Sequence, residues 1–276
     1  MNENSREIVR RSGSNLAFAL AVLPPEKRQD MRVFYAFCRV IDDIADDPGL
    51  GVEERVSGLA RWRALSSDNE LKPESGVEQE FVEMRKRYDL EPEMLLDIIE
   101  GVERDLYPQR FETSEELKDY CFHVASAVGL VSIDIFGYTN QATKTYAEQL
   151  GYALQWTNIM RDVGEDAGEG RIFLPLEDLK KFGISEEELL SMHVDKEKFQ
   201  GLMKLQAARA REFYVAAAKA LPEADEKSMR SAELMRRIYS GILDQMEEDG
   251  FQVFRKRYKL SKVRMIGEFL KAKYFG

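Results

Sequence analysis

Apolar residues recur along this chain at spacings of three and four, the period that places them on one face of an α-helix. Stretches in which β-branched and polar residues alternate, as they do in strands, are nearly absent. The pattern therefore predicts an all-α protein. We expect helices over residues 5–22, 26–47, 52–66, 77–88, 93–106, 114–137, 141–165, 195–220, 226–248 and 260–273.

Two longer connections separate the predicted helices. Residues 66–76 form a polar surface connection, and residues 168–175 form a glycine-containing loop. No repeat of solenoid period divides the chain, and 44% of its 276 residues are apolar, which is enough for one large core. We therefore expect a single domain over residues 1–276.

The sequence predicts a cytoplasmic protein. No run approaches the roughly 18 apolar residues needed to span a bilayer, and the N-terminus lacks the apolar segment of a signal peptide. Cys38 and Cys121 both fall inside predicted helices, and we interpret them as buried free thiols in a reducing compartment.

Carboxylates gather at the end of the second predicted helix, where a helix tolerates them least. Asp42 and Asp46, and likewise Asp43 and Asp47, stand four residues apart on one face, where like charges cost about 0.2–0.5 kcal/mol per pair. Pro48 ends the helix directly afterwards. The acids therefore also face the negative end of the helix dipole, at a typical cost of about 0.3–1 kcal/mol each. We infer that a cation offsets this repulsion.

A second stripe of the same kind lies in the helix predicted over residues 141–165. Asn158, Asp162 and Asp166 stand at successive four-residue intervals, and Gly164 precedes the end of that helix. Either cluster alone could be a solvated helix end. Two clusters with matching geometry, each surrounded by apolar residues, favour two stripes that face each other around cations.

Oxygen ligands without imidazole or thiolate suit a hard divalent cation and favour Mg²⁺, which completes its shell with water and phosphate oxygens. Zinc is disfavoured for the same reason. A di-iron site needs Glu-x-x-His, but His123 and His193 are preceded at that spacing by Tyr120 and Leu190. The spacing of an EF-hand loop is absent as well. The predicted metal ligands are Asp42, Asp46, Asn158, Asp162 and Asp166.

Net charge narrows the choice of partner. The chain has 50 acidic and 40 basic residues, and this balance of −10 argues against nucleic acid, whose binding needs a positive field. An acidic protein that binds an anionic substrate needs metal ions between them.

Two segments, residues 35–46 and 154–166, resemble the two signature segments of the squalene/phytoene synthase family. The resemblance extends through residues 120–130, 171–175 and 237–239 in the family's order, so it covers nearly the whole chain. It implies the isoprenoid synthase helical bundle, in which two Asp-rich helices face a central cavity.

The resemblance also implies a transferase, a prenyltransferase that joins two prenyl diphosphates head to head with two or three Mg²⁺ ions. Residues 120–138 look most like presqualene diphosphate and squalene synthases. The main prediction is therefore condensation of two farnesyl diphosphates to presqualene diphosphate and a C30 product: squalene, dehydrosqualene or hydroxysqualene. The alternative is a phytoene synthase that condenses two geranylgeranyl diphosphates, because residues 161–175 fit it equally well.

The resemblance assigns roles to individual residues. Arginine suits diphosphate because its planar fork binds phosphate oxygens in pairs. The implied catalytic residues are Asp42, Asp46, Asp162, Asp166, Tyr120 and Arg161. The implied substrate-binding residues are Ser14, Asn15, Tyr35, Arg39, Tyr239 and Arg257, with Asn15 standing where many members carry serine.

The implied chemistry passes through an allylic cation, which water would quench, so the cavity beyond the phosphates must be dry. Plain core packing is the alternative role of each apolar candidate. The candidates are Phe18, Phe34, Phe37, Phe122, Val124, Ala125, Val128, Leu154 and Trp156.

The C-terminal stretch, residues 255–273, is basic and amphipathic on an acidic chain. It could cover the phosphates, touch an anionic membrane surface, or be a solvated helix. NADPH use stays open, since the Gly-x-Gly-x-x-Gly fingerprint is absent and squalene synthases do not need it. Oligomeric state also stays open, and a terpene cyclase, a head-to-tail prenyltransferase and a non-catalytic assembly factor are further alternatives.

Overall fold

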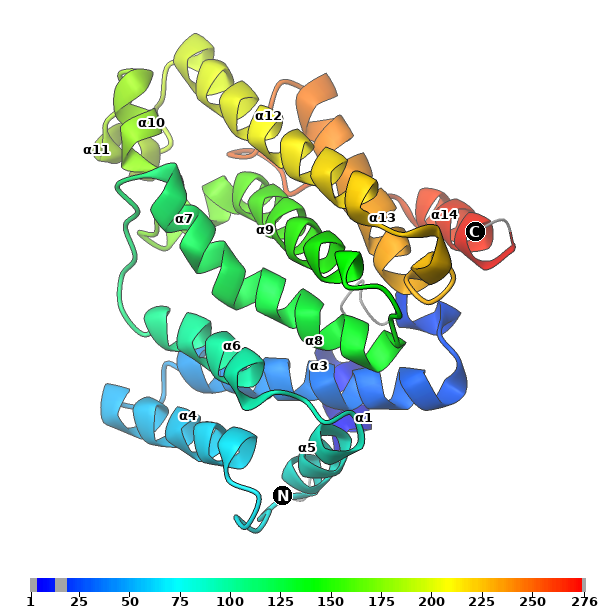
Figure 1. Cartoon of the computed structure of the whole chain (residues 1–276). Coiled ribbons are helices and arrows are strands. Elements are labelled where there is room, and N and C mark those ends of the chain that lie inside the picture. The colour runs from blue at the N-terminus through cyan, green and yellow to red at the C-terminus, as the bar shows by residue number, and fades with distance from the viewer. Residues whose placement is uncertain (1–3, 13–18, 275–276) are drawn as a thin grey trace.

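The computed structural model describes residues 4–12 and 19–274, and in this part of the chain every regular element is helical (Figure 1). The prediction of an all-α protein is confirmed. The elements are α1 (Ser5–Ser12), η1 (Leu20–Val22), α3 (Pro25–Asp46), α4 (Val52–Ser67), α5 (Gly76–Arg87), α6 (Pro92–Arg104), α7 (Ser114–Cys121), η2 (Phe122–Ser126), α8 (Ala127–Phe136), α9 (Ala142–Gly168), α10 (Leu176–Lys181), α11 (Glu186–Leu190), α12 (Lys196–Ala220), η3 (Glu223–Asp225), α13 (Arg230–Glu248) and α14 (Lys262–Tyr274).

Most helices lie within a few residues of their predicted bounds. Two were not predicted, because α10 and α11 have only six and five residues and are too short to show a helical period. The helix predicted over 226–248 begins later than expected, since α13 starts at Arg230. A short 3₁₀ turn at Glu223–Asp225 comes before it. The first predicted helix, 5–22, is described only in part: Ser5–Ser12 form α1 and Leu20–Val22 form η1, and residues 13–18 lie outside the described part.

Helix α9 is the buried spine of the bundle. It packs against α12, α13 and α8 and against the turn η2 that precedes α8, while α3 packs against α4, α5 and α6. Figure 1 shows α12 lying along the outer side of α9 and α3 crossing below α6 and α8. One continuous apolar core runs from Ile8 to Leu260. The two predicted Asp-rich segments therefore belong to central helices, α3 and α9.

The elements α7, η2 and α8 follow one another as a single rod (Figure 1). Its stretch Ser114–Phe136 is long and apolar enough to cross a membrane by length and composition, so the expectation that no segment passes this test is wrong here. The rod is apolar because two of its sides face away from solvent. Val131 and Ile135 are fully buried in the core, and Val124 and Val128 line an apolar cavity. These contacts are those of a core helix.

The turn η2 is a π-helical turn, a widening that often marks functional positions. Ser126 at its end donates a hydrogen bond of 2.8 Å to the Glu148 carbonyl oxygen of α9. Gly151 lies directly against this turn, because a Cβ added there would stand 2.5 Å from Ser126 Cα. The close approach of α9 to η2 therefore requires glycine at position 151.

We expect Gly151→Ala to destabilise the protein by about 1–3 kcal/mol, the usual cost of overpacking a core. Gly267→Ala on α14 is the matched control, since nothing lies within 4 Å of a Cβ at that position, and alanine favours a helix by up to about 1 kcal/mol. Urea denaturation followed by circular dichroism measures both. Equal stability of the two variants would contradict the packing described here.

Candidate active site

The first acidic cluster occupies the last turn of α3. Asp46 lines a polar cavity, and Asp42 stands half-buried one turn earlier. Asp43 instead forms an ion pair of 2.5 Å with Arg39, and Asp47 accepts a hydrogen bond from the Gly49 amide. The α3 acids are thus divided, because Asp42 and Asp46 share the inward face while Asp43 and Asp47 have partners of their own.

The second cluster lies on α9 as the four-residue spacing predicts. Asn158, Asp162 and Asp166 all line the same polar cavity as Asp46. Asp46 of α3 and the stripe of α9 therefore meet across one cavity of about 430 Å³, whereas Asp42, also a predicted metal ligand, does not line it.

An apolar cavity of about 290 Å³ adjoins the polar one, and Gln155 and Asn158 line both. Tyr35 and Tyr239 stand at the apolar side of this junction. The bulky side chains Phe136 and Tyr146 also belong to the apolar cavity. The arrangement joins a polar, acid-lined cavity to an apolar one.

Asn158 has an unusual environment at the junction. Its side-chain Oδ1 is buried and has no hydrogen-bond partner among the described residues. Its Nδ2 donates to the Gln155 Oε1 atom at 3.4 Å. A buried carbonyl oxygen without a partner is costly, so this oxygen is ready to accept a cation or a donor from a bound molecule.

Asp105, which follows α6, is a cavity residue that sequence reasoning missed. The Tyr120 hydroxyl donates to its two carboxylate oxygens at 3.0 and 3.1 Å. Both side chains line the polar cavity. The signal was present in the sequence, since Asp105 directly follows a helix end as Asp47 does, but a single acid has no repeat to reveal it.

Three arginines surround the α9 acids. Arg161 forms hydrogen bonds of 2.8 and 2.6 Å with its neighbour Asp162. Arg257 reaches Asp162 at 3.2 Å. Arg171, which was not among the predicted site residues, lies 3.3 Å from Asp166 and lines the cavity. These cations hold the carboxylates in place.

The remaining predicted binding residues are distributed unevenly. Arg39 is engaged by Asp43 and lines neither cavity described above, whereas Tyr239 lines the apolar cavity and also interacts with Arg161. Ser14 and Asn15 lie outside the described residues, as does Phe18.

The predicted apolar lining is partly wrong. Val124, Ala125, Val128 and Leu154 line the cavity, but the other candidates that the structure describes do not. Phe34 and Phe37 are fully buried core residues, and Phe37 stacks on Phe81 with ring centroids 4.6 Å apart. Phe122 packs against His123. Trp156 is also fully buried, and its indole donates to the Gln206 Oε1 atom at 3.1 Å.

Burial raises the pKa of three acids in and beside the polar cavity. Loss of contact with water, with added repulsion from Asp46 and Asp105, raises the pKa of Asp42 to about 7, although Arg39 opposes the shift. The same loss of water raises the pKa of Asp105 to about 6 against the hydrogen bond from Tyr120. It also raises the pKa of Asp166 to about 6 against the attraction of Arg171. Each shift shows that negative charge is unfavourable here without a cation.

The donor set fits a hard divalent cation. Carboxylates and the unpartnered Asn158 oxygen line the polar cavity, with no imidazole or thiolate among its lining residues. Among the described residues, the three-residue cluster whose ligand atoms lie within 4.8 Å of one another is Asp97, Glu100 and His123, outside this cavity. The cavity acids therefore form two separate walls, Asp46 on α3 and Asp162 with Asp166 on α9. A metal ion bound to either wall needs further oxygen ligands from water or a phosphate.

Comparison with known proteins agrees with this geometry. The sequence profile of the family described as Squalene/phytoene synthase matches residues 9–264. The chain is 32% identical over 268 residues to the 15-cis-phytoene synthase of Synechococcus elongatus, covering 92% of this chain and 86% of the relative. It is 33% identical over 269 residues to the phytoene synthase of Arthrospira platensis, with coverage of 92% and 86%.

Solved structures share the fold. A dehydrosqualene synthase crystallised with a ligand superposes with a TM-score of 0.86 at 26% identity, over 98% of this chain and 94% of that one. A squalene synthase from Alicyclobacillus acidocaldarius gives 0.79 at 24% identity, over 90% and 93%, a likeness that concerns the fold alone.

The raised pKa values predict how stability depends on pH. Between pH about 4, where an unfolded aspartate titrates, and pH about 7, the folded protein holds more protons than the unfolded one at Asp42, Asp105 and Asp166. Their contribution to the free energy of unfolding therefore falls as pH rises through this window. We expect the melting temperature in EDTA to fall from pH 5.5 to 7.5, and Mg²⁺ to reduce that fall. A melting temperature that rises over this window in the wild type but not in Asp42→Asn would contradict the assignment.

Two isosteric variants distinguish an acid that other acids repel, Asp42, from an acid that arginines pair with, Asp162. Asp42→Asn removes a crowded charge, so we expect it to raise the stability of the metal-free protein by about 1 kcal/mol. Asp162→Asn weakens contacts with Arg161 and Arg257, so it should be neutral or destabilising. Urea denaturation in EDTA at pH 7.5 measures both. Shifts of the same sign and size would show that the two walls do not differ in this way.

Proposed function

Since this chain belongs to the squalene/phytoene synthase family, whose members are prenyltransferases, we propose that it condenses two geranylgeranyl diphosphates head to head to form phytoene. The similarity to phytoene synthases over nearly the whole chain supports the C20 substrate over the C15 substrate of our main sequence prediction. The observation that carries the proposal is the junction at Gln155 and Asn158, where a cavity lined by acids opens into an apolar one.

The diphosphate groups bind in the polar cavity. Asp46 of α3 and Asp162 and Asp166 of α9 would hold Mg²⁺ there, with the Asn158 oxygen at the inner edge. When bound, the magnesium ions neutralise the charge that develops on a leaving diphosphate. Arg171 and Arg257 stand beside the same acids and can bind phosphate oxygens directly.

The prenyl chains extend into the apolar cavity. Val124, Val128 and Leu154 exclude water from the allylic cation that forms when diphosphate leaves. Ionisation therefore takes place near Asn158, and the hydrocarbon stays on the dry side of the junction. The double bond of the second prenyl diphosphate must lie against the carbon from which the first loses its diphosphate. Two prenyl chains held side by side in one cavity can achieve this.

Tyr120 and Asp105 form the proton-carrying pair of the polar cavity. Loss of contact with water and the adjacent Asp105 raise the pKa of Tyr120 well above its ordinary value, so this phenol keeps its proton. Its single hydroxyl proton already goes to Asp105 through the bonds of 3.0 and 3.1 Å, so a diphosphate oxygen would have to compete with Asp105 for that proton.

The C30 reaction is the second candidate. The structural likeness to a dehydrosqualene synthase at 26% identity favours it. Phytoene and dehydrosqualene need no reductant, so NADPH enters the proposal only if squalene is the product. A cytoplasmic enzyme is consistent with either reaction. Retention of the acids of both walls argues against a non-catalytic assembly factor.

We expect the purified protein with Mg²⁺ to convert geranylgeranyl diphosphate to phytoene without NADPH, and with a higher kcat/KM than it shows for farnesyl diphosphate. Mass analysis of the lipid extract, before and after phosphatase treatment, identifies the product and any cyclopropyl diphosphate. A C30 product with the higher kcat/KM would move the assignment to the second candidate. No product from either substrate would refute the catalytic proposal.

Asp46→Asn should lower kcat at least about a hundredfold, the cost of removing one group that stabilises developing charge. The matched control is Asp47→Asn, the next residue of the same segment, whose carboxylate binds the Gly49 amide outside the cavity. We expect the control to keep near wild-type turnover. Equal losses in both variants would show that the effect comes from the helix end and not from the site.

A further inference from the structure

Helix α14 has an apolar face that nothing in the described structure covers. Val263, Ile266 and Leu270 are 82%, 52% and 46% exposed. Their spacing of three and four places them on one side of the helix, and nothing lies within 4 Å of a Cβ built on Gly267 between them. We call these four residues the α14 stripe.

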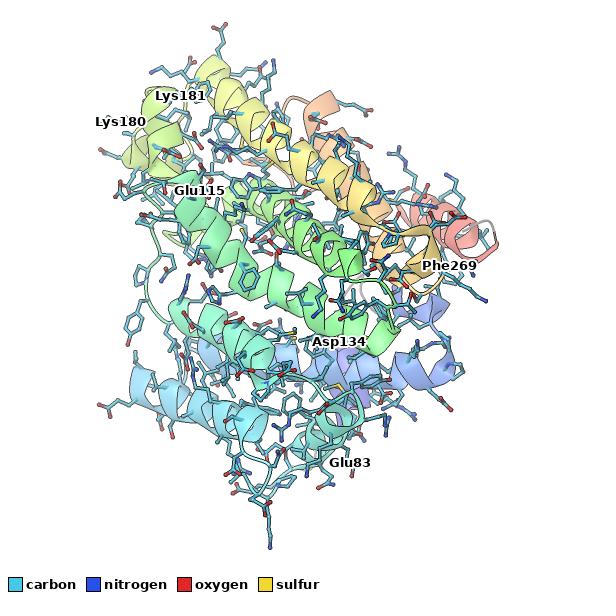
Figure 2. The ribbon with its side chains drawn as sticks, in the orientation of Figure 1. Glu83, Glu115, Asp134, Lys180, Lys181 and Phe269 are labelled. Atoms are coloured by element: carbon cyan, nitrogen blue, oxygen red, sulfur yellow. The ribbon has the colours of Figure 1, made fainter. Side chains whose placement is uncertain are left out.

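The opposite side of α14 holds the helix on the bundle. Met265 and Phe269 pack against the core, and the helix contacts α13 and η1. Figure 2 labels Phe269 on this helix at the outer edge of the bundle. Because Met265 and Phe269 already bury the inner side, the α14 stripe is not needed to hold the helix in place.

A basic cleft of about 230 Å³ lies between α13 and α14. Its cations are Arg236, Arg237 and Arg264. Arg236 is bound by Glu233 at 2.9 Å, but neither Arg237 nor Arg264 has an ion pair among the described residues. The cleft also contains Asp244 and Glu268, and Asp244 is paired with Arg211 at 2.5 Å. Two guanidinium groups thus remain available to an anion.

The sequence adds to this local positive charge. Residues 255–273 contain eight Lys or Arg residues and one acid, Glu268, although the whole chain carries a net charge of −10. Arg264 and the exposed Lys271 both lie beside the α14 stripe on the helix surface. An exposed apolar stripe with basic residues on its flank is the pattern of a helix that lies in a membrane interface.

One helix, α13, lies between α14 and the apolar cavity. Ala232, Met235 and Tyr239 of α13 line that cavity, and Arg236 and Ser240 of α13 line the basic cleft. α13 thus separates the two. A hydrocarbon product that leaves the cavity around α13 would emerge beside α14.

We propose that the α14 stripe docks on the surface of a bilayer that contains anionic lipids, with a lipid headgroup phosphate bound by Arg237 and Arg264. The apolar side chains enter the boundary between headgroups and acyl chains, and the basic residues are attracted to the anionic surface. A second copy of the chain fits less well, because a two-fold contact would place the same basic cleft against itself. The role in product release rests on the proposed function, whereas the docking itself does not.

The test is co-sedimentation of the full chain with vesicles of phosphatidylcholine alone or of phosphatidylcholine with phosphatidylglycerol. We expect binding to the anionic vesicles and little binding to the neutral ones. Ile266→Glu with Leu270→Glu should weaken binding more than tenfold. Arg237→Gln and Arg264→Gln should each weaken it about fivefold, the factor for one basic residue at an anionic surface.

The matched control places the same charges on another exposed apolar pair. Val52 and Val56 on α4 are each 44% exposed and neighbour Glu53 and Glu54. Val52→Glu with Val56→Glu should leave vesicle binding unchanged. Circular dichroism checks that each variant keeps its helices.

Three outcomes would overturn the proposal. One is equal binding to both kinds of vesicle, and another is equal loss in the α14 and α4 variants. The third is sedimentation velocity showing that Ile266→Glu with Leu270→Glu dissociates an oligomer while vesicle binding persists, which would assign the stripe to a second copy. Turnover measured in detergent keeps the proposals separate: vesicle binding without product would refute the proposed function alone, and product without vesicle binding would refute the docking alone.

Discussion

Burial of carboxylates away from water, with repulsion between them added, is the constraint on which the rest of this structure depends. Asp42, Asp105 and Asp166 each have a pKa well above that of a free aspartate, so the folded chain holds charge where it is unfavourable. The scaffold must therefore be rigid without help from the site. Helix α9 supplies that rigidity, because Trp156 donates to Gln206 of α12, and Gln206 donates in turn to the buried Asp178 of α10 at 2.8 Å.

The polar and apolar cavities need opposite environments yet must share a boundary. On α9 the boundary is crossed within about two helical turns, from Asp162 in the polar cavity to Leu154 in the apolar one, with Asn158 between them lining both. A charged side chain at position 158 would extend the polar region, and an apolar one would leave a bound cation without an oxygen. An amide serves both sides, since it binds a cation through its oxygen but carries no charge into the dry cavity.

The sequence was sufficient for the helices and for the acids, because both are periodic signals. The four-residue spacing of Asn158, Asp162 and Asp166 placed them on one face, and the structure puts that face on the cavity. Depth within the core was not predictable in this way. Phe37 and Trp156 are apolar and occur at the same helical spacing as the cavity residues, but they are fully buried in the core. Asp105 and Arg171 were missed because each is a single charged residue without a repeat, and only the fold shows that they line the cavity beside Tyr120 and Asp166.

Selection between a C15 and a C20 substrate must arise at the end of the apolar cavity that is remote from the acids. Along α9 the lining runs from Asn158 through Leu154, Leu150 and Ala147 to Tyr146. Tyr146 and Asn158 are twelve positions apart, which corresponds to about 18 Å of helix. The two substrates present the same diphosphate and the same reacting double bond, and differ only by one isoprene unit at the far end. In the proposed reaction the residues around the acids would determine the reaction type. The packing of Tyr146, which donates a hydrogen bond of 3.0 Å to the Glu233 carboxylate, would determine the chain length.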